Sequence, residues 1–137
     1  LCNSLGSALA HGLRPTLLGW DPPSWLERGK KPWSYHLGAK LVLPLEYLRR
    51  CEATIPNSTL VVFTDHDVVF QGGPTALRAA YRRAAAVGPA AARGAPLELV
   101  FSTEKESYPR ELAALYPPPP RGAAFHYLNS GMWMGPA

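Results

Sequence analysis

Residues 61–68, which read VVFTDHDV, are the part of the chain that decides the fold. The first half of this stretch belongs to an apolar, β-rich run over residues 59–63, which is typical of a strand buried on both faces in a parallel sheet. Asp65 and Asp67 follow the run directly, with His66 between them. Ligands of open α/β sheets bind at the carboxyl ends of the strands. The stretch therefore predicts a ligand site at these three residues.

Outward from this stretch, expected helices and strands alternate at short spacing. Apolar residues at helical or strand spacing predict helices over residues 1–12, 35–51, 75–87 and 111–116, and strands over residues 13–18, 59–63, 68–70, 97–102 and from about 127 onward. Loops are expected over residues 19–32, 88–96 and 103–110. Pro44 lies inside the second helix, where it predicts a kink or a break. This alternation predicts an α/β fold with a mostly parallel sheet flanked by helices.

Composition limits the class of protein. The chain has 137 residues, 47% hydrophobic and 18% charged, which indicates one globular domain with a core of its own. The net charge is +4, and the basic residues are scattered instead of concentrated with aromatic residues on one face. We therefore expect no nucleic-acid partner. A mild positive charge suits a small anionic ligand such as a nucleotide diphosphate.

The ends of the chain and its cysteines lead to further expectations. The sequence starts at Leu1 inside an expected helix and stops at Ala137 after an apolar run, so we expect a domain that is incomplete at both ends. Cys2 and Cys51 leave two alternatives open, a disulfide and two free thiols. The triplet at residues 57–59 is a glycosylation sequon in an expected loop, which agrees with a secretory location.

The two aspartates are candidate metal ligands. Two carboxylates in one crevice are costly to keep ionised unless a positive charge lies between them. Mg²⁺ or Mn²⁺ would supply that charge, because both prefer oxygen ligands. The alternative is that Asp65 and Asp67 only cap the turn after the strand, as aspartate often does.

Two further groups of residues are candidate ligand contacts. Asn129 and Ser130 have groups that hydrogen-bond sugar hydroxyls, and Gly131 lets a ligand approach the backbone, although a simple turn into a strand explains these residues too. Trp25 has an aromatic face for a base and Lys40 a charge for phosphates. The alternative for this pair is a tryptophan that packs its loop and a lysine on a solvated helix face.

Taken together, these residues resemble the glycosyltransferase domain of the procollagen lysyl hydroxylases and the related collagen-type galactosyl- and glucosyltransferases. The resemblance covers nearly the whole chain and rests on the order and spacing of blocks of sequence. The blocks are residues 17–19, Trp25 with Gly29, residues 38–40, 63–77, 99–104, 116–117 and 128–131. Nothing in the chain resembles the dioxygenase domain of those enzymes.

The resemblance implies a GT-A fold, Mn²⁺ (or Mg²⁺) as the cofactor and a UDP-sugar as the donor. Asp65 and Asp67 match the acidic metal-binding motif of the family, which often has two residues between its aspartates where this chain has only His66. The resemblance also implies that the first strand of the fold precedes Leu1, and that further acidic residues and a metal-binding histidine follow Ala137. It places the nucleotide or donor contacts at Trp25, Lys40, Thr64, His66, Asn129, Ser130 and Gly131.

The expected function is that of a hexosyltransferase that moves a sugar from a UDP-sugar to a hydroxyl group on a protein or peptide. By resemblance, the expected location is the lumen of the endoplasmic reticulum or Golgi. The alternative is a catalytically inactive domain that binds a nucleotide-sugar or a protein partner, which the shortened acidic motif favours. A transferase of another GT-A family would share the metal site and differ in its acceptor loops.

Overall fold

A computed structural model of the chain describes residues 2–19, 34–87, 99–108, 110–119 and 121–137, without the side chains of residues 34–38. The elements in chain order are α1 (Cys2–Ala10), α3 (Ser34–Cys51), β1 (Leu60–Thr64), α4 (Pro74–Val87), β2 (Val100–Glu104), the 3-10 helix η1 (Arg110–Leu115) and β3 (Tyr127–Pro136). The mixed α/β class predicted from the sequence is confirmed.

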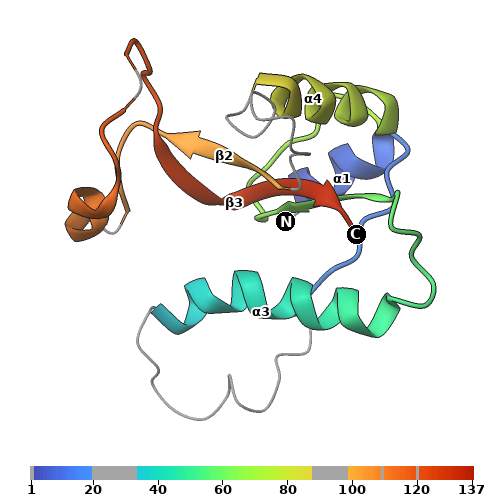
Figure 1. Cartoon of the computed structure of the whole chain (residues 1–137). Helices are drawn as coiled ribbons and strands as arrows, with labels where there is room; N and C mark the ends of the chain where they lie inside the picture. The colour runs from blue at the N-terminus through green and yellow to red at the C-terminus, as the bar shows by residue number, and fades with distance from the viewer. Residues whose placement is uncertain (1, 20–33, 88–98, 109, 120) are drawn as a thin grey trace.

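The three described strands form one sheet in the order β1-β3-β2 (Figure 1). β3 pairs with both neighbours in antiparallel orientation, so the prediction of a mostly parallel sheet is wrong for the described strands. β1 and β2 do run in the same direction, with α4 between them in the chain. The apolar pattern predicted strands near these positions correctly, but the prediction that they are fully buried is wrong, because no residue of β1 or β2 is buried. The pattern also contains no information on which strand lies beside which. β3 follows a connection without an α-helical crossover and takes the central position.

Helices cover both faces of the sheet. Figure 1 shows α3 on one side, and α1 and α4 on the other. On the α1 side, the Phe70 N–H donates a hydrogen bond of 2.9 Å to the Ser7 hydroxyl, which itself donates to the Ser4 carbonyl at 2.9 Å. On the α3 side, the hydroxyl groups of Thr16 and Tyr47 lie 3.4 Å apart. The fold is a three-layer arrangement with the sheet in the middle.

The helix ends follow local chemistry. α1 ends at Ala10, and Gly12 takes a φ of 70° while the Leu13 N–H bonds back to the Ala8 carbonyl at 2.9 Å. Glycine accepts this left-handed conformation at little cost, which is why it closes helices. α3 runs through Pro44 without the expected break. α4 begins at Pro74, because the missing N–H of proline has no helical partner to lose in the first turn.

Two smaller predictions are wrong. Residues 13–18 and 68–70 were expected to be strands, but the structure assigns no strand to either. Leu17 and Val69 are exposed, and neither segment pairs with the described sheet. Cys2 and Cys51 are free thiols, the first exposed and the second half-buried. None of the described helices is long and apolar enough to cross a membrane.

Candidate functional site

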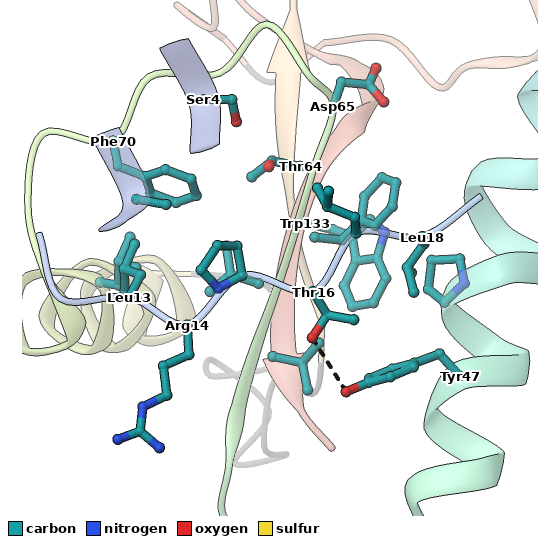
Figure 2. A pocket seen from close by; sticks show the side chains of 18 of the residues that line it. Ser4, Leu13, Arg14, Thr16, Leu18, Tyr47, Thr64, Asp65, Phe70 and Trp133 are labelled. Carbon is teal, nitrogen blue, oxygen red and sulfur yellow. Dashed lines mark hydrogen bonds between the residues drawn. The ribbon is translucent and has the colours of Figure 1, made fainter. Parts of the chain in front are cut away.

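The acidic motif begins where β1 ends. Asp65 follows Thr64, the last residue of β1, and its N–H donates a hydrogen bond of 2.7 Å to the Gly131 carbonyl of β3. Asp65 is half-buried, whereas His66 and Asp67 are exposed in the turn that follows. The backbone bond to β3 fixes the start of the turn. The Asp65 carboxylate therefore has a defined position at the carboxyl end of β1 (Figure 2).

Lys40 reaches Asp65 from the helix on one face of the sheet. Its ammonium group forms an ion pair with Asp65 Oδ2, and the two side chains are 28% and 25% exposed. Lys40 lies in α3, four residues before Pro44. Because proline has no backbone N–H, the Lys40 carbonyl lacks the helical hydrogen bond that residue 44 would otherwise donate. The ion pair joins two blocks that are 25 residues apart in the sequence.

β3 adds an amide oxygen to the same place. The Asn129 Oδ1 accepts a hydrogen bond of 2.6 Å from the Gly131 N–H. A Cβ atom on Gly131 would lie 2.9 Å from Asn129 Oδ1 and 2.9 Å from Asp65 Oδ2. The two oxygens therefore converge on the space over Gly131. This position tolerates only glycine without a shift of one of them, since Cβ contacts below 3.0 Å are essentially never seen.

A bulge between β2 and β3 sets the direction of the Asn129 side chain. The β2–β3 register shifts between Phe101 and Ser102, which pair with Trp133 and Asn129. The Ser102 hydroxyl lies across the bulge, 3.1 Å from the Met132 carbonyl and 3.4 Å from the Asn129 carbonyl. Bulges re-aim side chains and are frequent beside active sites. Sequence analysis missed Ser102, because one serine at the end of an apolar run carries no signal of a bulge in the partner strand.

The charged and polar groups beside Gly131 suit two kinds of ligand, a divalent cation and a phosphate group. Asp65 Oδ2 and Asn129 Oδ1 are hard oxygen donors for a divalent cation, and Lys40 is a cation for phosphate oxygens. No group of three His, Cys, Asp or Glu side chains able to hold a metal occurs in the described part of the chain. The two oxygens alone would suit only a cation of the Mg²⁺ type that takes one or two protein ligands and completes its shell with substrate phosphates and water.

The structure treats the predicted site residues differently. It brings together Lys40, Asp65, Asn129 and Gly131. Thr64 and His66 line the groove that opens beside them. Asp67 makes no ion pair with any described residue, and Ser130 is half-buried in the bulge of β3. Trp25 lies outside the described residues, as does the expected loop over residues 88–96.

Comparisons with known proteins give this chain no relatives. No protein-family profile matches it, and no curated protein and no solved structure does so either.

Proposed function

We propose that this chain is part of a metal-dependent glycosyltransferase that transfers a sugar from a UDP-sugar to a hydroxyl group of a protein or peptide. One observation carries the proposal. Lys40, Asp65 and Asn129 come from three separate blocks of the resemblance, and their polar ends meet beside Gly131 at the end of β1. A turn-capping role for Asp65 does not call for a lysine from a helix or an amide from another strand.

Each residue has a chemical task in this proposal. The oxygens of Asp65 and Asn129 would hold Mn²⁺ or Mg²⁺. Asp67, in the turn that follows Asp65, would be the second acidic residue of the motif. A bound cation neutralises charge on the leaving diphosphate. Lys40 adds a second positive charge for the phosphates, and such stabilisation of a leaving group is electrostatic, not covalent. The absence of a side chain at Gly131 lets the oxygens of Asp65 and Asn129 converge beside the donor, while Thr64 and His66 face the nucleotide.

The finer fold and the location are proposals of the same kind. A GT-A-like architecture is supported by the sequence blocks and by the common direction of β1 and β2, which places their carboxyl ends at the same edge of the sheet. The sequon at residues 57–59 supports the secretory pathway, because Asn57 is exposed in a turn.

A second candidate function is a domain that binds a nucleotide-sugar or a protein partner without catalysis. The Lys40–Asp65 ion pair favours it, because the ammonium group already neutralises the carboxylate that a metal would need. Hydrolysis of UDP-glucose and UDP-galactose separates the two: a transferase releases UDP slowly in the presence of Mn²⁺ even without an acceptor, whereas a binding domain does not.

Calorimetric titration of UDP into the protein, with and without Mn²⁺, tests the proposal. We expect binding that requires Mn²⁺ and that weakens at least tenfold in Asp65→Asn and Asp67→Asn. Glu52→Gln is the matched control for Asp67→Asn, because both carboxylates are exposed in turns and Glu52 lies outside the site. Absence of UDP binding by a folded wild type in both conditions would refute the nucleotide-sugar proposal.

A further inference from the structure

The turn that leads into β1 contains an asparagine with no bonding role of its own. Residues 56–59 form a β-turn, closed by a hydrogen bond of 2.8 Å from the last N–H to the first carbonyl. Asn57 and Ser58 occupy its two central positions, and both are exposed. Asparagine is frequent in turns because its side chain bonds the nearby backbone. The Asn57 amide, unlike that of Asn129, makes no hydrogen bond with a described residue, so the turn does not require it.

Asn57 also begins a modification signal. It is followed by serine and then by Thr59, which gives the form Asn-x-Ser/Thr without proline in the middle, the acceptor sequence for N-linked glycans. The other two asparagines of the chain, Asn3 and Asn129, are each followed by serine and then by leucine or glycine. Neither begins an acceptor triplet, so the chain offers a glycan one asparagine.

No described residue covers this asparagine. From Glu52 to Ser58 every residue except Ile55 is exposed. Figure 1 shows this connection between α3 and β1, drawn in green, as a loop at the outside of the fold. A modifying enzyme has to reach the side-chain amide, and the attached glycan is bulky and hydrated. Both require an open position of this kind.

The turn lies at the other end of β1 from the candidate site. β1 begins three residues after Asn57 and ends directly before Asp65. Its five residues span about 16 Å at the usual rise of an extended strand. The N–H of Ala137, the residue after β3, donates a hydrogen bond of 3.0 Å to the Thr59 carbonyl and fixes the end of the turn. A glycan on Asn57 would therefore leave the candidate site open to its ligands.

We propose that Asn57 carries an N-linked glycan. In the modification step, Asn57 Nδ2 forms a bond to the anomeric carbon of an oligosaccharide that is carried on a lipid diphosphate. The bond from that carbon to the diphosphate oxygen breaks, the lipid diphosphate leaves with the electron pair, and a base of the modifying enzyme takes one amide proton. The glycan keeps residues 52–58 in solvent, because a bulky hydrated group does not enter a packed interface. The inference rests on the lumenal location given with the proposed function, and not on the metal or UDP site.

Synthesis of the chain behind a cleavable signal sequence, in the presence of endoplasmic reticulum microsomes, tests this inference. The signal sequence supplies the lumenal location, and its removal shows that the chain has entered. We expect the wild type to gain the mass of one oligosaccharide and to lose it on treatment with peptide N-glycosidase, which leaves aspartate at residue 57. Asn57→Gln and Thr59→Ala should prevent the gain. Ser58→Ala is the matched control, because it keeps the acceptor triplet and should be modified like the wild type.

A second measurement tests the position of the glycan on the folded chain. The glycosylated protein, before and after enzymatic removal of the glycan, should melt at the same temperature and bind UDP with Mn²⁺ equally well. Three results would overturn the inference: an unmodified Asn57 in a chain whose signal sequence has been removed, a mass gain that persists in Asn57→Gln, and a lower melting temperature or weaker UDP binding with the glycan attached. Absence of UDP binding in both samples would refute the proposed function alone, and the glycosylation site would stand.

Discussion

Gly131→Ala is the substitution for which the structure gives the clearest magnitude. The new Cβ would lie 2.9 Å from both Asn129 Oδ1 and Asp65 Oδ2, and 3.5 Å from Asp65 Cγ. Neither oxygen is free to move away, because Asn129 is bonded to the Gly131 N–H and Asp65 to Lys40. Overpacking of this kind costs about 1–3 kcal/mol. If Asn129 swings away, the lost hydrogen bond costs about 1 kcal/mol.

Overpacking and displacement of the Asn129 side chain would both change the site, so thermal unfolding and UDP binding are both informative assays. We expect thermal unfolding to shift down by roughly 4 °C for each kcal/mol lost in a domain of this size. We also expect Mn²⁺-dependent UDP binding to weaken at least tenfold, which corresponds to about 1.4 kcal/mol. Gly6→Ala is the control: a Cβ there meets nothing within 4 Å, and alanine stabilises a helix such as α1 by about 0.5–1 kcal/mol. Unchanged stability and unchanged UDP binding in Gly131→Ala would refute the convergence of the two oxygens.

Three other substitutions test separate contacts. Ser7→Ala leaves the Phe70 N–H without its partner and should lower the free energy of unfolding by about 1–3 kcal/mol, measured by urea denaturation; Ser58→Ala, exposed in a turn, should have no effect. Ser102→Ala should cost about 0.5–1.5 kcal/mol and speed exchange of the Gly131 amide, while equal exchange in both proteins would contradict the role of Ser102 in the bulge. Lys40→Met should cost between about 1 kcal/mol, as for exposed ion pairs, and about 3 kcal/mol, as for buried ones. Mn²⁺ should then raise the melting temperature of Lys40→Met more than that of Lys105→Met, and equal responses would argue against a metal at Asp65.

Much of the fold was predictable because local patterns carry it. The apolar run before Asp65, the amphipathic stretch over residues 75–87 and the proline that precedes it predicted β1 and α4 to within a few residues. The pairing of the strands was not predictable in the same way. β3 takes the central position because of contacts between distant segments, and a single sequence shows no register between them.

The candidate site likewise combines residues that the sequence predicted with a geometry that it did not predict. Asp65, Lys40, Asn129 and Gly131 were named from residue chemistry and resemblance, and the structure brings them together. Their geometry depends on the bulge in β3 and on Ser102, which no local pattern indicates, because a bulge belongs to a pair of strands.

Paramagnetic relaxation by Mn²⁺ is the most direct test of the central claim, which is that a metal and a diphosphate meet at Asp65 and Asn129. In NMR spectra of the wild type with UDP, substoichiometric Mn²⁺ should broaden the amide resonances of Asp65, Asn129 and Gly131 first. The same spectra of Asp65→Asn should show no such broadening. Broadening that is centred elsewhere in the chain, or that is unchanged in Asp65→Asn, would contradict the account.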